Sequence, residues 1–348
     1  MSVFTAPDYA DHEQVVFASD PDAGLRAVIA IHDTTLGPAL GGCRMWPYPS
    51  EQEAVADALR LSRGMTYKSA LAELPMGGGK AVVLGDPGHD KSAALWRAFG
   101  RAIERLGGRY ITGEDVGTSV GDLEIVRTAT PHVAGIAEGG AGDPSPATAF
   151  GVFVGMQAAV GRRLGGAGLA GLRVAIQGLG HVGLGLAEHL AETGAELVVA
   201  DLDPERVETV VSRFGARAVD PARIHAEDVE VFAPCALGSV LNDDTIPDLR
   251  APVVAGSANN QLAEPRHGAA LAERGVLYAP DYAINAGGII NVSHESTRTG
   301  RPYDRQAAFA HIARIQDTLG RIFEIADADR IPTSVAADRL AEERLRAA

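Results

Sequence analysis

The first part of the chain alternates between two spacings of hydrophobic residues, one typical of strands and one typical of helices. Apolar runs of strand length stand at 25–32, 81–84 and 109–112. Between them, small or apolar residues recur every three or four positions, which indicates helices after Ser50 and over about 91–106. Ser50 is a suitable N-cap because Glu53 follows three residues later, and Lys68 stands at or beyond the end of this helix. The segment 36–50 is rich in turn-forming residues and is predicted to be irregular.

The second part of the chain alternates more regularly. Pro146, preceded by Ser145 as N-cap, indicates a helix that runs to about Arg163. Strand-like runs then stand at 173–176, 196–200, 229–232, 253–256 and 276–278, with a helix at about 204–214. Strands that alternate with helices predict βαβ units and a parallel sheet. The C-terminal part is helical, with a break at 331–332, after which Thr333 is the expected cap of a last helix.

A change in composition at 138–146, where Gly and Pro are concentrated, indicates a domain boundary. The expected fold class is therefore α/β with two domains, 1–145 and 146–325, followed by C-terminal helices over 326–348. A length of 348 residues is enough for a separate hydrophobic core in each domain.

The composition excludes several classes of function. A net charge of −14 argues against nucleic-acid binding, which needs a basic surface. No apolar run approaches the roughly 20 residues that cross a bilayer. The N-terminus lacks the basic region and apolar run of a signal peptide, and Cys43 and Cys235 lack metal-ligand spacing. We therefore expect a cytoplasmic protein with no metal site, no nucleic-acid partner and no membrane association.

The sequence RVAIQGLGHVGLGLAEHL carries a dinucleotide-binding motif. Gly178, Gly180 and Gly183 form G-x-G-x-x-G between a predicted strand and a predicted helix, which indicates a Rossmann-type domain. The first glycine makes a tight turn, the second lets the backbone approach a pyrophosphate, and the third packs the helix against the strand. Asp201, 18 residues after Gly183, is placed to accept hydrogen bonds from ribose hydroxyls. Its charge repels a 2′-phosphate, and the two residues after it offer no arginine, so NAD is expected rather than NADP.

Two lysines stand in a mostly apolar, glycine-rich stretch, GMTYKSALAELPMGGGK. Each lysine taken alone is most simply a structural residue whose stem covers apolar surface. Together with an NAD domain and with Asp115, which follows a predicted strand, Lys68 and Lys80 fit a reaction centre. One ammonium can pair with a substrate carboxylate, and a second amine, desolvated beside another cation, can act as a general base. This pattern supports a small acidic substrate and a base, and it leaves the reaction open.

Eight segments, in order, resemble the NAD-dependent L-amino-acid dehydrogenases of the leucine, phenylalanine and valine type, which are related to glutamate dehydrogenase. The segments are GPALGGCRMW (37–46), GMTYKSA (64–70), PMGGGKAVV (75–83), GEDVGT (113–118), GGAGDPSPATAFGV (139–152), QGLGHVG (177–183), AGSANNQL (255–262) and YAPDYAINAGG (278–288). The resemblance implies reversible oxidative deamination of an L-amino acid to a 2-oxo acid and ammonia. It also implies a homo-oligomer, an N-terminal substrate and oligomerisation domain to which the C-terminal helices return, and an interdomain cleft that closes, with 138–145 as a hinge.

The resemblance assigns roles in the N-terminal domain. Lys68 would bind the substrate α-carboxylate, with the backbone of Gly41 and Gly42 lining that site. Lys80 would act as the base that activates a water molecule, and Asp115 would exchange protons with the amino nitrogen. The three glycines before Lys80 would leave room for substrate or water.

The resemblance also assigns roles in the second domain. Asn259 would lie near the substrate amino group and the nicotinamide, with Asn260 beside it on the cofactor side. The glycine triplet and Asp201 would hold NAD.

The resemblance places five positions at the substrate side chain: Leu40, Met65, Gly113, Ile289 and Val292. The apolar Leu40 and Met65 disfavour glutamate, because a buried carboxylate without a cation is costly. Gly113 resembles the phenylalanine enzymes, where it leaves room for a ring, whereas the branched Ile289 and Val292 narrow the pocket for leucine or valine. These positions slightly favour a branched-chain aliphatic substrate over phenylalanine, and both substrates stay open.

Two other functions stay as alternatives. A hydroxy-acid or opine dehydrogenase would share the cofactor domain, but hydroxy-acid enzymes usually pair a histidine with an arginine. A non-catalytic NAD-binding regulator would be expected to lack Lys68, Lys80 or Asp115, and all three are present.

Overall fold

The computed structural model describes residues 3–6, 8–136, 141–166, 168–236, 238–295 and 302–348. The chain forms two compact units. Unit 1 comprises residues 1–143, 292–303 and 341–348, and unit 2 comprises 144–291 and 304–340. Part of the expected hinge, residues 138–140, lies outside the described residues.

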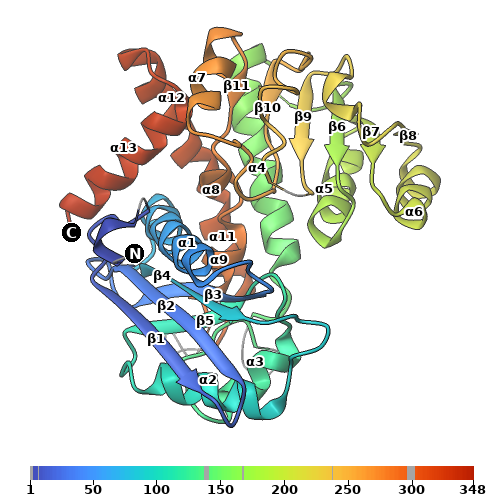
Figure 1. Cartoon of the computed structure of the whole chain (residues 1–348). Coiled ribbons are helices and arrows are strands. Elements are labelled where there is room, and N and C mark those ends of the chain that lie inside the picture. The colour runs from blue at the N-terminus through green and yellow to red at the C-terminus, as the bar shows by residue number, and fades with distance from the viewer. Residues whose placement is uncertain (1–2, 7, 137–140, 167, 237, 296–301) are drawn as a thin grey trace. The chain divides into compact units, whose positions relative to one another are not determined.

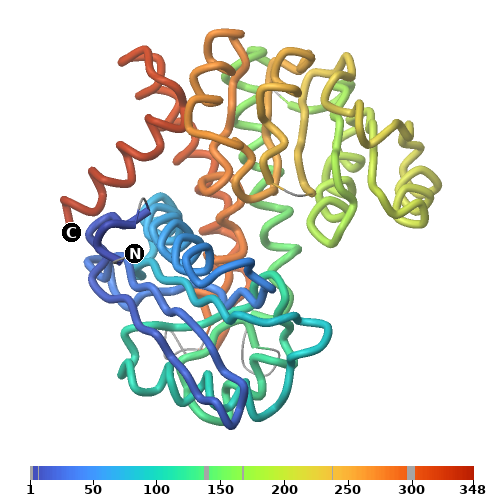
Figure 2. Tube along the Cα trace, in the orientation of Figure 1, coloured from blue at the N-terminus to red at the C-terminus, as the bar shows by residue number. Residues whose placement is uncertain are grey.

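Unit 1 contains a five-stranded sheet in the order β1-β2-β4-β3-β5. Its strands are β1 (Gln14–Asp20), β2 (Leu25–Asp33), β3 (Ala39–Trp46), β4 (Gly77–Leu84) and β5 (Tyr110–Glu114). β1 and β2 form the antiparallel hairpin drawn in blue in Figure 2. β2 pairs antiparallel with β4, whereas β3 lies between β4 and β5 and is parallel to both.

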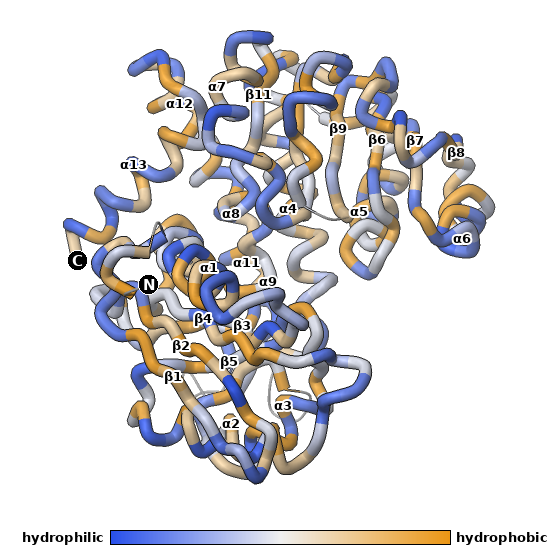
Figure 3. Tube along the Cα trace, in the orientation of Figure 1, coloured by the Kyte–Doolittle hydropathy of each residue, from blue (hydrophilic) through white to orange (hydrophobic). Residues whose placement is uncertain are grey.

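Helices cover both faces of this sheet (Figure 1). α1 (Glu51–Leu71) lies on one face, and α2 (Ala93–Glu104) and α3 (Val120–Arg127) lie on the other. β2 is mostly hydrophobic along its length (Figure 3), and both of its faces are buried: Val28 packs toward α1, and Ile29 packs toward α2. A strand buried on both sides reads as a continuous apolar run, and the predicted strand at 25–32 is confirmed.

The segment predicted to be irregular contains β3, so that prediction was wrong. Gly41 and Gly42 lie inside the strand, where glycine normally weakens pairing. A Cβ atom at Gly41 would stand 1.7 Å from the carbonyl oxygen of Gly79 in β4. The strand therefore depends on a close approach of neighbouring backbones, which local propensity does not reveal.

α1 begins where the sequence predicts. The Ser50 hydroxyl accepts a hydrogen bond from the Glu53 N–H, which satisfies one of the free donors of the first turn. The helix continues to Leu71, however, so Lys68 lies inside its last turn rather than beyond its end. This longer helix places Lys68 on a rigid element.

Residues 341–348 contribute a cap to the same helix. The Arg344 guanidinium donates to the carbonyl oxygens of Ala70 and Leu71 at 3.1 and 2.6 Å and pairs with Glu73. The last carbonyls of a helix have no intrahelical donor, and a cation there also interacts favourably with the helix dipole. The C-terminal residues thus stabilise the end of α1 that carries Lys68.

Unit 2 is a doubly wound sheet. Its six strands are β6 (Arg173–Gln177), β7 (Glu196–Ala200), β8 (Arg217–Ala218), β9 (Val231–Pro234), β10 (Val253–Val254) and β11 (Leu277–Tyr278). They are all parallel, in the order β11-β10-β9-β6-β7-β8. The chain order of the strands runs outward from the central β6–β9 pair, with three strands in each half. This is the strand order of a Rossmann fold, so the predicted fold class is confirmed.

The helices of unit 2 and of the C-terminal part are α4 (Ser145–Leu164), α5 (His181–Glu192), α6 (Pro204–Phe214), α7 (Arg266–Glu273), α8 (Asp281–Ile284), α9 (Gly287–Ser293), α11 (Arg305–Ala313), α12 (Ile315–Asp329) and α13 (Thr333–Arg346). Two predicted caps were wrong. Pro144 is the N-cap of α4, and Ser145 is its first helical residue. Thr333 is the first residue of α13, and its hydroxyl donates to the Tyr278 carbonyl at 2.6 Å.

Protein atoms, and not substrate or water, fill the space beside the three glycines before Lys80. A Cβ atom at Gly77 would stand 2.1 Å from the Asp33 carbonyl oxygen, and one at Gly78 would stand 2.0 Å from the Thr66 nitrogen of α1. At Gly79 it would stand 2.8 Å from the Tyr110 ring. The prediction of open space was therefore wrong. These glycines let α1 and Tyr110 pack directly on β4.

We predict that Gly78→Ala destabilises unit 1, because the new methyl group would displace the backbone of α1 at Thr66. The free energy of unfolding should fall by about 1–3 kcal/mol or more. Gly64→Ala is the matched control: it adds the same methyl group within α1, where no atom lies within 4 Å. It should raise stability by up to about 1 kcal/mol. Urea denaturation of both variants measures the two effects, and equal stabilities would contradict this packing.

Candidate active site

Lys80 is a buried cation at the centre of β4. Its side chain is only 7% exposed, and its Nζ lies 2.7 Å from Oδ2 of Asp115. A buried charge needs a partner of opposite charge, because the desolvation of an unpaired ion is very costly. The pair therefore joins the two residues that the sequence predicts to be catalytic.

Gly42 makes room for this ion pair. β5 ends at Glu114, and the chain then turns over β3 at the position of Gly42. A Cβ atom at Gly42 would stand 2.5 Å from the Glu114 carbonyl oxygen and 2.8 Å from Cβ of Asp115. Any larger residue at this position would push Asp115 away from Lys80.

A second cation, Arg44, binds the same carboxylate. Its Nε donates to Oδ2 of Asp115 at 3.0 Å, and its Nη1 donates to Oδ2 of Asp57 on α1 at 2.9 Å. Tyr48 donates its hydroxyl to the same Asp57 oxygen at 2.6 Å. Sequence reasoning missed Arg44 and Asp57. The only signal was the position of Arg44 two residues after the Gly41-Gly42 pair, on the same strand.

Asp115 stays ionised in this setting. Burial by itself raises the pKa of the Asp115 carboxyl, but the charges of Lys80 and Arg44 outweigh it and hold the pKa below its usual value. A lowered pKa in the folded state means that Asp115 contributes stability above its unfolded pKa and loses it as the pH falls. At neutral pH the carboxylate is therefore an anion.

Leu40, Gly42 and Gly113 among the predicted residues share one face of the sheet with Arg44, whereas Gly41 alternates to the other face. Parallel pairing aligns Leu40 with Gly78, Arg44 with Val82, and Gly42 with Gly113. Because side chains alternate along a strand, these positions and Lys80 lie on the face that α1 covers. Leu40 is 3% exposed, and Met65 and Lys68 are half-buried on the last two turns of α1. The fold thus gathers them on that side of unit 1.

Ile289 and Val292 stand on α9, about one turn apart, and both are half-buried. Ile289 belongs to unit 2 and Val292 to unit 1. Their roles at a substrate side chain stay predictions.

The glycine triplet has the geometry that a dinucleotide site requires. Gly178 has φ +96°, and a Cβ atom there would stand 2.7 Å from Ala236. A Cβ atom at Gly183 would stand 2.0 Å from the carbonyl oxygen of Gly178, so this glycine lets α5 pack against the end of β6. Gly180 is the N-cap of α5, and the nearest atom to its Cβ position is Nη1 of Arg206 at 3.9 Å. The N-terminus of α5 offers N–H groups to a phosphate.

Asp201 follows β7 and braces the same turn. Its carboxylate accepts hydrogen bonds from the Leu179 N–H at 2.6 Å and from the Asp203 N–H at 2.8 Å. The two residues after Asp201 offer no arginine, as the sequence indicates, but α6 brings Nη1 of Arg206 to 3.9 Å from the Cβ position of Gly180. Nε of Arg206 pairs with Asp203 at 3.2 Å.

Asn259 and Asn260 are exposed on the loop after β10. The buried Asn285, which sequence reasoning missed, donates its Nδ2 to the Ser257 carbonyl oxygen at 3.0 Å and to Oδ1 of Asn259 at 2.8 Å. A backbone carbonyl can only accept, so the Asn285 NH2 group must point at it. The same NH2 group fixes the orientation of Asn259, whose own NH2 group therefore lies on its other side.

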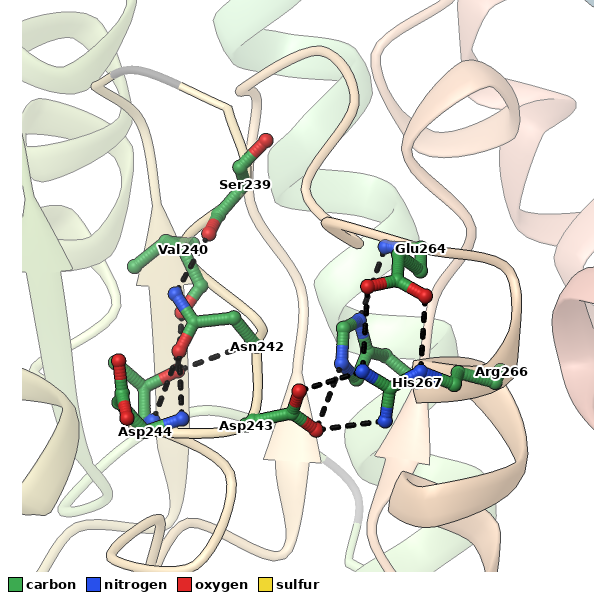
Figure 4. A network of polar contacts seen from close by, with 9 residues as sticks. Ser239, Val240, Asn242, Asp243, Asp244, Glu264, Arg266 and His267 are labelled. Atoms are coloured by element: carbon green, nitrogen blue, oxygen red, sulfur yellow. Dashed lines mark hydrogen bonds and ion pairs between the residues drawn. The ribbon is translucent and has the colours of Figure 1, made fainter.

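A second loop supports Asn260. The Ser239 N–H donates to the Asn260 carbonyl oxygen at 2.7 Å, and both residues have positive φ, +62° and +52°. Strained positions of this kind persist where the surroundings enforce them. Arg266 joins Asp243 at 2.7 Å and Glu264 at 2.9 Å, which ties the loops after β9 and β10 together (Figure 4).

In the described part of the chain, no group of three or more His, Cys, Asp or Glu side chains is arranged to hold a metal ion. No helix there combines the length and the apolar character that a membrane crossing requires.

Comparison with known proteins matches both halves of the chain. Residues 12–132 match the family model described as Glu/Leu/Phe/Val dehydrogenase, dimerisation domain. Residues 201–341 match the model described as Glutamate/Leucine/Phenylalanine/Valine dehydrogenase.

Individual relatives match over nearly the whole chain. Leucine dehydrogenase from Geobacillus stearothermophilus is 55% identical over 347 residues, which cover 99% of this chain and 94% of that protein. Phenylalanine dehydrogenase from Bacillus thermotolerans is 48% identical, over 97% of this chain and 89% of that protein. The crystal structure of L-tryptophan dehydrogenase from Nostoc punctiforme superposes with a TM-score of 0.84 and 47% identity, over 97% of this chain and 96% of that one.

The glycine triplet in a doubly wound sheet and the Lys80–Asp115 pair agree with these matches: the chain belongs to the Glu/Leu/Phe/Val dehydrogenase family and is an amino-acid dehydrogenase that acts on a CH–NH2 group.

Proposed function

We propose that this chain catalyses the reversible, NAD-dependent oxidative deamination of a branched-chain or aromatic L-amino acid to the 2-oxo acid and ammonia. The observation that carries the proposal is the buried pair of Lys80 and Asp115 on the α1 face of unit 1. An ion pair whose side chains are 7% and 17% exposed, and whose carboxyl has a shifted pKa, is a candidate for chemistry.

Each predicted residue has a task in this reaction. Lys68 binds the α-carboxylate of the substrate, beside the backbone of Gly41 and Gly42. Asp115, an anion at neutral pH, pairs with the substrate ammonium group and takes up a proton from it. Lys80, once it has lost its proton, removes a proton from the water molecule that attacks the imine carbon, and ammonia then leaves.

NAD fits the residues of unit 2 and supplies the acceptor for the hydride of the substrate Cα. Gly178, Gly180 and Gly183 leave the N-terminus of α5 open to a pyrophosphate. Asp201 is placed for the ribose hydroxyls, and its charge disfavours a 2′-phosphate. Asn259 and Asn260 lie toward the nicotinamide, where the Asn259 amide, oriented by Asn285, faces the substrate amino group.

An apolar side chain suits the substrate pocket. Leu40 is buried and Met65 is half-buried, so no cation among these positions balances a second carboxylate. Ile289 and Val292 add branched side chains, whereas Gly113 leaves open space. Relatives named for leucine, phenylalanine and tryptophan at similar identity support both classes of substrate. A difference of one methylene group is worth only about 1–3 kcal/mol, so overlapping specificity is expected.

The proposal includes the setting of the enzyme. We assign residues 1–145 to the substrate and oligomerisation domain, 146–325 to the NAD domain, and 326–348 to helices that return to the first domain. Of this last segment, residues 341–348 belong to unit 1, whereas 326–340 belong to unit 2. The match to a dimerisation domain supports a homo-oligomer. We place the enzyme in the cytoplasm.

The test of the proposed function is a panel of the standard L-amino acids with NAD and with NADP at alkaline pH, followed by nicotinamide absorbance. We expect NAD reduction with L-leucine, L-valine or L-phenylalanine, and none with L-glutamate. Strong turnover of glutamate would refute the pocket argument, and no turnover with any of them would refute the function.

Lys80→Ala should abolish turnover and leave NADH binding intact, because it removes the base and not the cofactor site. The loss should be at least about 10²–10⁴-fold in kcat. Lys91→Ala is the matched control, since Lys91 is the third of only three lysines in the chain and pairs with Asp122 instead. Steady-state kinetics and NADH fluorescence titration measure both effects. Survival of turnover in Lys80→Ala would show that another group is the base.

Gly113→Ala should shift preference from phenylalanine toward leucine and valine. The nearest atom to a Cβ at this position is the Ala134 carbonyl oxygen at 3.7 Å, an ordinary contact, so the fold should tolerate the change. The ratio of kcat/KM for leucine over phenylalanine should rise roughly 10-fold or more. An unchanged ratio would place Gly113 outside the pocket.

Asp201→Ser should reduce the preference for NAD over NADP. It removes the charge that repels a 2′-phosphate, and it leaves Arg206 close to the phosphate-binding turn. The ratio of kcat/KM for NAD over NADP should fall about tenfold or more. If the ratio stays at the wild-type value, Asp201 does not select the cofactor.

A further inference from the structure

We propose that Arg44 is a positioning residue that keeps the Asp115 carboxylate charged and in place while Lys80 gives up its proton. This inference rests on the proposed function, in which Lys80 is the base. It assigns a role to a residue that contacts the catalytic pair from a neighbouring strand.

The geometry places both cations on one atom. Oδ2 of Asp115 accepts from Nζ of Lys80 at 2.7 Å and from Nε of Arg44 at 3.0 Å. The Lys80 side chain is 7% exposed, and those of Arg44 and Asp115 are 19% and 17% exposed, so water screens these contacts weakly. The carboxylate is therefore shared between two cations that compete for the same oxygen.

The two cations differ in their chemistry. A lysine amine loses its proton in order to act as a base, whereas a guanidinium group stays charged at every pH at which the enzyme works. If Lys80 were the only cation beside Asp115, the loss of its proton would leave a buried carboxylate without a counter-charge. Asp115 would then draw the proton back or become protonated itself. Arg44 removes this difficulty because its charge remains.

Arg44 is itself held in place from the opposite side. Its Nη1 donates to Oδ2 of Asp57 at 2.9 Å, which also accepts from the Tyr48 hydroxyl at 2.6 Å, and Oδ1 of Asp57 accepts from Arg60 at 2.7 Å. Charges of alternating sign thus run from Lys80 through Asp115, Arg44 and Asp57 to Arg60. The fork of the guanidinium group bridges two carboxylates on different elements, a geometry that a single ammonium group cannot reproduce.

The ionisable groups around Asp115 come from several elements. β4 contributes Lys80 and β3 contributes Arg44, while α1 contributes Asp57 and Arg60 behind Arg44, and β5 contributes the buried Tyr110. The loop between β3 and α1 contributes Tyr48. Burial raises the pKa of this phenol well above its usual value, and its hydrogen bond to Asp57 raises it further. On the other face of β3, burial raises the pKa of the Cys43 thiol, so this group is neutral. Arg44 is thus a permanent cation in direct contact with the Asp115 carboxylate.

The test is the pH dependence of kcat/KM for NAD-dependent deamination of L-leucine, or of the best substrate in the panel, in wild type, Arg44→Gln and Arg44→Lys. Arg44→Gln removes the charge and keeps a polar side chain. The acid limb of its pH profile should move to higher pH by about one unit. A carboxylic acid and an ammonium group both lose a proton less readily when a neighbouring cation is removed. Activity should recover in part at alkaline pH.

Arg44→Lys restores a cation but not the bridge. We expect its acid limb to stay near the wild-type position, while kcat falls roughly tenfold because Asp115 is held less rigidly. Arg101→Gln is the control: Arg101 pairs with Asp20 at 3.0 Å on an exposed surface, so both the limb and kcat should match wild type. Thermal unfolding and NADH titration of each variant show whether it is folded.

A folded Arg44→Gln variant with a wild-type acid limb would overturn the role of Arg44 and leave the proposed function intact. If Arg44→Gln does not fold, the Arg44→Lys profile decides, since a limb displaced by a full unit in that variant would also overturn the proposal. Failure of the wild-type enzyme to reduce NAD with any amino acid would instead refute the proposed function.

Discussion

The structure of unit 1 depends on the burial of one lysine. A charge on the central strand β4 is tolerated only with a counter-ion, and Asp115 supplies it from the end of β5 at 2.7 Å. That contact requires the chain after β5 to turn over β3, which only a residue without a side chain allows at Gly42. Gly78 separately lets α1 lie directly on β4. The glycines of these strands therefore serve close packing, and Gly42 in particular serves the ion pair.

The use of basic residues shows the same constraint. Only three of the 31 basic residues are lysines, and two of these are Lys68 and Lys80. Arginine serves at the surface, at the C-terminus of α1 and beside Asp115, where a permanent charge and several donors are sufficient. An amine is kept where a proton must leave, because a guanidinium group cannot act as a base at ordinary pH. The contrast between Lys80 and Arg44 on one carboxylate oxygen follows from this difference.

Local signals in the sequence predicted much of the fold. The Ser50 cap, the α6 helix and the strand β7 stand where the pattern places them, because each depends on neighbouring residues along the chain. The strand β3 was missed, since two glycines and flanking prolines read as a turn, and only the adjacent backbones of β4 and β5 make it a strand. The glycines before Lys80 were read as open space for the same reason: packing by Thr66 and Tyr110 comes from elsewhere in the sequence.

The candidate site shows where motif reasoning stops. Lys80, Asp115, Arg44 and Asn285 all stand in the segments that carry the family resemblance, but the roles of Arg44 and Asn285 become visible only through contacts over 71 and 26 positions of the chain. Both residues hold a predicted residue in one state: Arg44 fixes the charge of Asp115, and Asn285 fixes the amide of Asn259. A reactive group needs a defined protonation state or orientation before it can act. The role of a residue that imposes such a state comes from its contacts, so the fold shows it and the motif does not.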